Sequence, residues 1–524
     1  MERHARELQH GSRPPIIELT GTGLTPAKVV AVARTDAEVE LADDARDAMA
    51  ESAAIVERLA ESDEPAYGVS TGFGSLATTP IPAERREELQ RSLIRSHAAG
   101  MGPPVEPEVV RAMLLLRARS LAMGYSGARP AVAEAMLALL NAGLTPVVPE
   151  HGSLGASGDL APLAHCGLAL IGEGAVQVSD GTEVEAAEAL RRAGIEPLTL
   201  TAKEGLALIN GTDGVLGMLL LAVHDMDRLL RVADVTAAMS VEALLGTDRA
   251  FAEDLIGLRP QPGQALSAAN MRRLLADSAI VASHREDDPR VQDAYSLRCA
   301  PQVNGAARDT VAHAREVASA ELASAIDNPM ILADGRVESC GNFHGAPLAL
   351  VCDFLAIAAA DVGAIAERRT DRLLDASRSY GLPPFLAEDP GVNSGLMIAQ
   401  YTQAAMVAEN RRLAAPASVD SVPTSAMQED HISMGWGAAR KLRVALANLD
   451  RILAVELATA ARGLELRTPL APAPGTRAAL AAVRDGVPGP GPDRWLAPEL
   501  AGVEELVRSG AVVDAVEDAI GSLE

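Results

Sequence analysis

The stretch Ala346–Leu374 reads APLALVCDFLAIAAADVGAIAERRTDRLL. Apolar side chains recur along it at helical spacing, which is typical of a long helix with a broad buried face. Its most apolar part, Leu348–Ala366, is interrupted by Asp353 and Asp361. Acidic residues inside the apolar run favour a buried helix of a bundle over a membrane-spanning helix.

Three further stretches have the same spacing: Asp213–Leu245, Ser394–Leu413 and Met434–Leu464. Before Asn210 the chain instead mixes short helical patterns with loops rich in glycine and proline, and its best strand pattern is a hairpin around Gly174–Val184. We therefore predict a mainly α fold, in which a smaller, loop-rich N-terminal region precedes a core bundle of long helices. The predicted division is 1–15 as a flexible extension, 16–210 as the N-terminal region, and 211–524 as the bundle with a C-terminal helical segment.

Composition limits the class of protein. Of the 524 residues, 48% are apolar but only 2% are aromatic, so Ala, Leu and Val must fill the core. The formal net charge of −25 disfavours nucleic acid and an anionic membrane surface as partners. The four cysteines have no metal-type or disulfide-framework spacing, and the first fifteen residues lack the apolar run of a secretory signal. We expect a cytoplasmic protein.

The loop Gly152–Leu160, GSLGASGDL, is the most informative short motif. It lacks the Lys-Ser/Thr of a phosphate-binding loop, and Asp159 stands where a nucleophile elbow needs glycine. An ordinary turn before a helix capped by Asp159 is a third interpretation. A fourth is chemical: the amide nitrogen of Gly158 can attack the carbonyl carbon of Ala156, and Ser157 can then lose its hydroxyl. The product is an electrophilic methylidene group, which standard side chains do not provide.

The segment Gly152–His165 resembles the signature of the aromatic amino acid ammonia-lyases and aminomutases, and the likeness extends from about Ile17 to near the C-terminus. Members of this family form the prosthetic group 4-methylidene-imidazol-5-one (MIO) from Ala-Ser-Gly, here Ala156, Ser157 and Gly158. The resemblance implies a fumarase/aspartase-like helical fold, no external cofactor, and a homotetramer whose subunits share active sites.

The resemblance also assigns roles to individual residues. Tyr67 matches the base that removes the substrate β-proton, and Arg298 matches the clamp for the substrate carboxylate. Tyr295 and Gln292 match residues around the electrophile. Asn210 matches an asparagine that holds the electrophile's carbonyl oxygen or the substrate carboxylate.

Phe343 matches a wall of the substrate pocket, but by its sequence alone it fits core packing nearly as well. Without the resemblance, Tyr67 also fits a buried turn residue, and Arg298 fits a surface charge.

Four positions indicate the substrate. Ser96 and His97 resemble the polar pair of the histidine-type members, although His97 could also be a hydrogen-bonded core histidine. Gln428 and Glu429 match the Gln-Glu pair of those members, and a carboxylate can bind an imidazole N–H strongly in a dry pocket. Ser75 stands where the aminomutases tend to have Glu, which favours net elimination.

We therefore expect a carbon–nitrogen lyase that converts L-histidine to trans-urocanate. The alternatives are a tyrosine or phenylalanine ammonia-lyase, an aminomutase, or a helical scaffold that has lost catalysis. We expect no metal, because His151, His165, His344 and His431 lack ligand spacing.

Overall fold

The computed structural model describes residues 16–61, 70–72, 79–155, 158–286, 288 and 290–524. The chain divides into two compact units. The first contains the described residues up to Leu221 with Arg315–Cys352 and Ala417–Arg440, and the second contains Ala222–Ala314, Asp353–Pro416 and Lys441–Glu524. The predicted borders at residues 15 and 210 stay predictions. Each unit is described separately below.

The first unit is built around the buried helix α5, Pro107–Ala122. Pro107 opens this helix at a position where its missing N–H is not needed, and every residue from Val109 to Ala122 is buried. Helices α2, α3 and α6 pack against it. The other helices before the long ones are α2 Pro26–Thr35, α3 Asp43–Ala60, α4 Arg86–His97, α6 Pro130–Asn141, α7 Leu160–Leu170, α8 Ala186–Ala193 and α9 Glu204–Ile209, with the 3-10 turn η2 Ala83–Arg85.

Strands in the first unit are short. Parallel β1 Ile17–Leu19 and β2 Val39–Leu41 form one pair, and antiparallel β8 Met330–Ile331 and β9 Val337–Glu338 form another. Strands β4 Thr145–Pro146, β6 Ala175–Gln177 and β7 Glu183–Glu185 form an antiparallel sheet, whose β6–β7 hairpin confirms the predicted one. Antiparallel β3 Met101–Pro104 and β5 Pro149–His151 place Met101 opposite His151, so the segment after α4 lies beside the start of the Gly152 loop.

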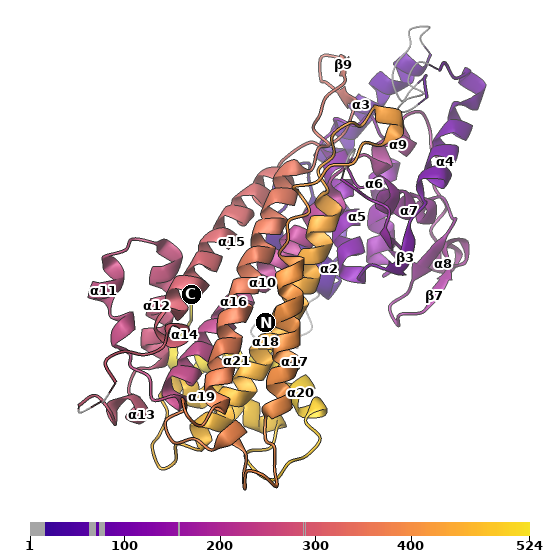
Figure 1. Ribbon diagram of the computed structural model, residues 1–524. Coiled ribbons are helices and arrows are strands. Elements are labelled where there is room, and N and C mark those ends of the chain that lie inside the picture. Colours follow the sequence, from indigo (N-terminus) through magenta and orange to yellow (C-terminus); the bar gives the residue numbers. More distant parts are fainter. Residues whose placement is uncertain (1–15, 62–69, 73–78, 156–157, 287, 289) are drawn as a thin grey trace. The chain divides into compact units, whose positions relative to one another are not determined.

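Long helices form the rest of the core, and Figure 1 shows α16, α17 and α18 side by side. They are α10 Asp213–Ala243, α15 Ala300–Leu322, α16 Ala346–Leu374, α17 Met397–Leu413 and α18 Gly435–Glu465. The four predicted long helices are confirmed, with ends within three residues of those expected. Helix α15 was not predicted, because its buried face combines small and polar residues, alanine above all, and its apolar periodicity is therefore weak.

In the second unit the long helices are joined by close packing and by buried polar contacts. A Cβ added at Gly363 of α16 would lie 3.1 Å from the Ile452 side chain of α18. From α17, Gln403 donates to the Ile452 carbonyl at 2.8 Å. The shorter helices are α11 Glu253–Gly257, α12 Pro262–Leu274, α13 Ala279–Ala282, α14 Tyr295–Arg298, α19 Pro474–Gly486, α20 Ala497–Ser509 and α21 Ala511–Ile520.

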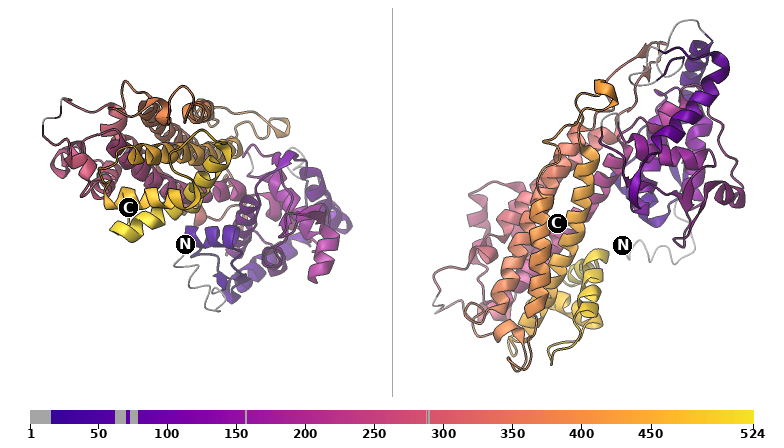
Figure 2. Two further views of the ribbon diagram at one scale, coloured as in Figure 1. Left: turned by 90° about the horizontal axis from the view of Figure 1, so that it is seen from below. Right: turned by 45° about the vertical axis from the view of Figure 1, so that its right-hand side comes forward.

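Helices α19, α20 and α21 pack against one another at the C-terminal end of the chain, and the yellow ribbons of Figure 2 show this group. The remaining 3-10 turns are η3 Arg249–Phe251, η4 Pro384–Leu386 and η5 Ser425–Met427.

Two helical segments, Glu204–Ala243 and Ala346–Leu374, are long and apolar enough to cross a membrane by length and composition alone. The most apolar window of the first is 100% buried inside the chain, and that of the second is 56% buried. Buried core helices of globular proteins pass the same test.

Candidate active site

Asp159 attaches the Gly152–Leu160 loop to the N-terminus of α10. Its carboxylate Oδ2 accepts hydrogen bonds from the backbone N–H groups of Gly214, at 2.8 Å, and Val215, at 3.0 Å. Its own N–H donates to the Gly211 carbonyl at 2.6 Å. Helix α7 begins directly after Asp159, as the third interpretation of the loop expected, but the Asp159 carboxylate caps α10 and not α7. The loop is therefore fixed to the helix that follows Asn210.

Glycine is required at both ends of the Ala-Ser segment. Gly158 has φ +81°, and an added Cβ would lie 2.2 Å from the Gly211 carbonyl oxygen. Gly155 has φ +76°, and its Cβ would lie 2.4 Å from the hydroxyl of Ser433, which donates to the Gly155 carbonyl at 2.9 Å. The backbone is thus confined on both sides of positions 156 and 157. Ala156 and Ser157, like Tyr67 and Ser75, lie outside the described residues.

Asn210 is buried, and its amide orientation is set by its neighbours. Its Nδ2 donates to Asp327 Oδ1 at 3.1 Å and to the Asn328 carbonyl at 2.9 Å. Lys203, itself fully buried, pairs with the other oxygen of Asp327 at 2.7 Å. Both Nδ2 hydrogens therefore have acceptors, while Oδ1 has no hydrogen-bond donor among the described residues. For Asn210 to donate to an oxyanion, one of these bonds must break.

Three carboxyl groups are buried around the N-terminus of α10. Burial raises the pKa of Asp159 to about 7, although its hydrogen bonds with Val215, Ser153 and Gly214 favour the charged form. Burial also raises the pKa of Asp213 above its ordinary value, against the opposing charge of Arg117. The pKa of Glu321 is raised by burial as well. The region disfavours negative charge unless a donor or cation meets it.

Ser96 and His97 end helix α4, next to β3. His97 Nδ1 lies 2.9 Å from the Leu93 carbonyl, so that nitrogen carries the proton and Nε2 can accept a hydrogen bond. Burial lowers the pKa of His97, whereas the Leu93 hydrogen bond and the negative charge of Glu429 act in the opposite direction. Of the residues predicted to select the substrate, His97 therefore lies close enough to Glu429 for the carboxylate charge to act on its ring.

Glu429 and Gln428 follow a left-handed turn in which Ser425, Ala426 and Met427 all have positive φ. Glu429 is half-buried, and its Oε2 accepts a hydrogen bond from the Thr424 hydroxyl at 2.5 Å, whereas Gln428 is exposed. Positive φ in three successive non-glycine residues is strained, and such strain is concentrated at functional sites.

Phe343 is half-buried, and the residue after it links it to this segment. The rings of His344 and His431 stack with centroids 5.6 Å apart. Residues 343–344 and 428–431 are thus neighbours.

The remaining predicted site residues belong to the second unit. Tyr295 and Arg298 form the ends of the short helix α14, and the guanidinium carbon of Arg298 lies 4.6 Å from the centre of the Tyr295 ring. Arg298 Nε donates to the Asp293 carbonyl at 2.9 Å. No hydrogen bond joins its two terminal nitrogens to another described residue. Tyr295 is 72% exposed, and Gln292 is exposed as well.

The sequence did not indicate three groups that hold the predicted site residues in place. The Asp159 carboxylate caps α10, the Ser433 hydroxyl binds the Gly155 carbonyl, and the Asp293 carbonyl accepts from Arg298. Asp159 was signalled by its position directly after the glycine, but Ser433 and Asp293 make contacts that no local pattern indicates.

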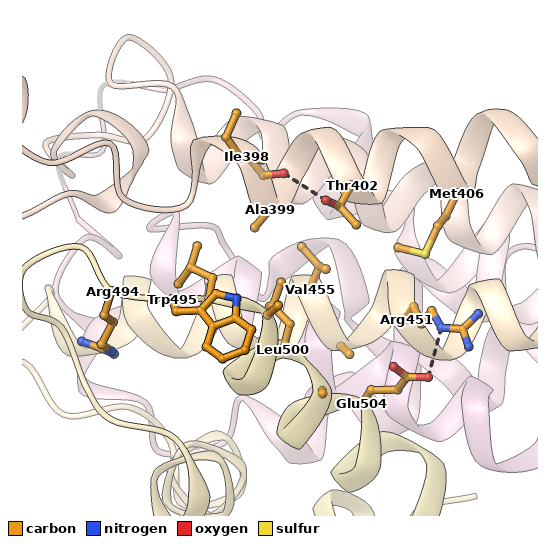
Figure 3. A pocket seen from close by; sticks show the side chains of 14 residues that line it. Ile398, Ala399, Thr402, Met406, Arg451, Val455, Arg494, Trp495, Leu500 and Glu504 are labelled. Carbon is orange, nitrogen blue, oxygen red and sulfur yellow. Dashed lines mark hydrogen bonds and ion pairs between the residues drawn. The ribbon is translucent and has the colours of Figure 1, made fainter.

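A pocket of about 540 Å³ lies in the second unit between α17, α18 and α20 (Figure 3). Ile398, Trp495 and Leu500 line it, and Arg451 pairs with Glu504 at 3.1 Å. None of the described residues that line it is a predicted site residue.

Comparison with known proteins identifies the class. The family model described as "Aromatic amino acid lyase" matches residues 24–485. The chain belongs to the aromatic amino acid lyase family and is a carbon–nitrogen lyase, as its sequence predicted.

Individual relatives indicate the type of enzyme within this family. A histidine ammonia-lyase of Streptomyces avermitilis is 62% identical over 96% of this chain and 98% of its own length. A histidine ammonia-lyase of Deinococcus radiodurans is 50% identical over 94% of this chain and 93% of its own length. Among solved structures, the histidine ammonia-lyase of Trypanosoma cruzi has a TM-score of 0.89 at 40% sequence identity, and the match covers 97% of this chain and 96% of that chain. These findings confirm the mainly α fold and the histidine-type assignment within the family.

The raised pKa of Asp159 predicts a pH-dependent stability. Between the ordinary value of 3.8 and about 7, the folded protein keeps a proton that the unfolded chain has lost. Raising the pH through this window therefore favours unfolding. Relative to Asp159→Asn, the wild type should lose up to about 4 kcal/mol of unfolding free energy between pH 4 and pH 7, at about 1.4 kcal/mol per pKa unit.

Denaturant unfolding over this pH range measures the difference. Asp47→Asn, at an exposed position of α3, is the control and should show no such trend. A pH-independent difference between wild type and Asp159→Asn would contradict the assignment.

Proposed function

We propose that this protein eliminates ammonia from L-histidine to give trans-urocanate. The main support is the 62% identity with a curated histidine ammonia-lyase over nearly the whole chain. The placement of His97 near the charge of Glu429 adds a local reason, since both groups suit a polar ring.

We further propose that Ala156, Ser157 and Gly158 become MIO. The surroundings fit a cyclised backbone, because Gly158 has no room for a Cβ beside Gly211, and Asp159 and Ser433 hold the flanking residues. When formed, the group supplies an electrophilic carbon for the substrate amine. Gly158 would provide the attacking nitrogen, and Ser157 would provide the methylidene carbon.

Arg298 would bind the substrate carboxylate. Its Nε is occupied by the Asp293 carbonyl, so the pair of terminal nitrogens is left to form a bidentate contact. Tyr67 would accept the β-proton, and Tyr295 and Gln292 would orient the reacting groups.

Asn210 Oδ1 is an acceptor, and it therefore suits an N–H of the substrate amine better than a carboxylate oxygen. This role differs from the one that the family resemblance gives to Asn210, which is to hold the electrophile's carbonyl oxygen or the substrate carboxylate.

Glu429, with Gln428, would bind the imidazole ring. A carboxylate can accept from an imidazole N–H, and the bond gains strength where water is excluded. His97 Nε2, Ser96 and Phe343 would complete the ring pocket.

We propose a homotetramer with shared active sites, in the cytoplasm, without nucleic acid, membrane, metal or external cofactor. Exposed apolar side chains support assembly. Leu350, Phe354 and Ile357 follow one face of α16, and Ile398 and Tyr401 follow one face of α17. Apolar faces of this kind are usual at subunit interfaces.

The alternative is a tyrosine or phenylalanine ammonia-lyase, or an aminomutase. A tyrosine aminomutase structure from Streptomyces globisporus has a TM-score of 0.92 with 39% identity and covers 97% of this chain and 100% of that chain. The backbone is thus shared by enzymes of different specificity, so substrate assays must separate them.

Turnover of L-histidine, L-tyrosine and L-phenylalanine, with product identification, tests the substrate. We expect trans-urocanate and ammonia from L-histidine, and little product from the other two. Predominant cinnamate or coumarate would show that the histidine assignment is wrong, and recovery of a β-amino acid would indicate an aminomutase.

Intact-mass measurement tests MIO. The wild type should be two water molecules lighter than its encoded chain. Ser157→Ala should lack the methylidene and lose nearly all activity, yet retain the fold and the oligomeric state. Normal turnover by this variant, or an unshifted mass in active wild type, would refute the prosthetic group.

Glu429→Gln should lower kcat/KM for L-histidine by about 10- to 100-fold, the usual effect of losing a charge-assisted hydrogen bond. Its melting temperature should change little, because Glu429 is only half-buried. Asp430→Asn, at the adjacent exposed position, is the matched control and should keep wild-type kinetics. Equal kinetics for both variants would exclude Glu429 from substrate binding.

A further inference from the structure

A buried arginine lies behind the helix that carries Tyr295 and Arg298. Arg369 of α16 donates from Nη1 to the carbonyl oxygen of Ser296, at 3.3 Å. Ser296 lies within α14, between the two predicted site residues. Arg369 therefore contacts the backbone that holds both of them.

The orientation of Arg369 is fixed by Glu456 of α18. Its Nε and Nη2 both bond to the Glu456 carboxylate, the latter at 2.9 Å, and both side chains have 0% exposure. The hydroxyls of Thr236 and Ser240 on α10 donate to the same carboxylate at 2.8 and 2.9 Å. Glu456 thus accepts four hydrogen bonds, which leaves the guanidinium little freedom to move.

A second anchor lies just before α14. The carboxylate of Asp293 accepts the Thr247 N–H at 2.7 Å and a hydrogen bond from Arg290 at 3.2 Å. The carbonyl of Asp293 accepts from Arg298 Nε. The short helix is therefore held at Asp293 and at Ser296, and the terminal nitrogens of Arg298 are left for a ligand.

A buried ion pair of this kind contributes little net stability, because desolvation offsets most of the attraction between the charges. The ion pair does fix the orientation of the guanidinium group, because its hydrogen bonds are all satisfied in one arrangement. The main effect expected of this ion pair, compared with an apolar core contact, is therefore to orient the backbone to which Arg369 is bonded.

We propose that Arg369, held by Glu456, is a positioning residue that orients α14 so that Arg298 and Tyr295 meet the substrate. The inference depends on the proposed function for the roles of those two residues. Arg369 itself lies behind the α14 backbone, so its effect on the reaction is indirect.

Arg369→Lys tests this role. A lysine can keep the charge pair with Glu456, but its single ammonium lacks the planar fork that reaches Glu456 and Ser296 together. We expect KM for L-histidine to rise about tenfold or more, as small misplacements of binding groups do. The fall in kcat should be smaller, and the folded state and oligomer should persist. Hydrogen exchange in the peptide spanning residues 293–299 should accelerate.

Arg308→Lys is the matched control. Arg308 pairs with buried Asp234 at 2.7 Å in the same unit, but it makes no hydrogen bond to α14 among the described residues. It should leave KM and exchange in residues 293–299 at wild-type values. Equal effects of both variants would indicate general destabilisation and would overturn the proposal.

The double variant Arg369→Met/Glu456→Leu removes the pair without leaving a buried charge alone. We expect it to fold and to show the same rise in KM and exchange. Wild-type KM and exchange in either folded variant would refute the positioning role. If the wild type fails to convert L-histidine, the proposed function fails, whereas the exchange comparison still decides whether Arg369 anchors α14.

Discussion

The attachment of Asp159 to the N-terminus of α10 is the interaction on which the candidate site depends. Helix N-termini present unpaired N–H groups and a partial positive charge, and a carboxylate satisfies both. Here that carboxylate follows directly after Gly158, so capping the helix also places Gly158 against Gly211. One contact therefore couples a long core helix to the loop in which we propose that MIO forms. The close approach of the two backbones then explains why position 158 accepts only glycine.

The buried charged groups near this contact orient one another, although burying them costs hydration free energy. Lys203, Asp327 and Asn210 form a chain in which each polar group limits the orientation of the next. Burial raises the pKa of Asp159 and Asp213, because a buried carboxylate loses the hydration that stabilises its charge. A buried environment of this kind strengthens the hydrogen bonds made within it, because little water competes for them. For the same reason, removing one partner of a buried pair lowers the free energy of unfolding, because the other partner is left buried and unpaired.

Two separate networks support the predicted site residues, one in each unit. In the first, β3–β5 pairing and the Ser433 contact place the segments of His97 and Glu429 around the loop. In the second, Asp293 and the Arg369–Glu456 pair hold α14. The predicted site residues are thus held by two kinds of local contact, a strand pairing in the first unit and a buried ion pair in the second.

The sequence by itself determined the helical class, the four long helices, the β6–β7 hairpin and the family, because helical periodicity and the Ala-Ser-Gly motif are local patterns. It missed α15, whose alanine face carries too little periodic signal. Only the tertiary structure decided that Asp159 caps α10 rather than α7, that Asn210 presents its oxygen, and that Arg369 contacts α14. These contacts join residues tens of positions apart or more, and hydrogen-bond partners at that separation are chosen by packing, which no local pattern encodes.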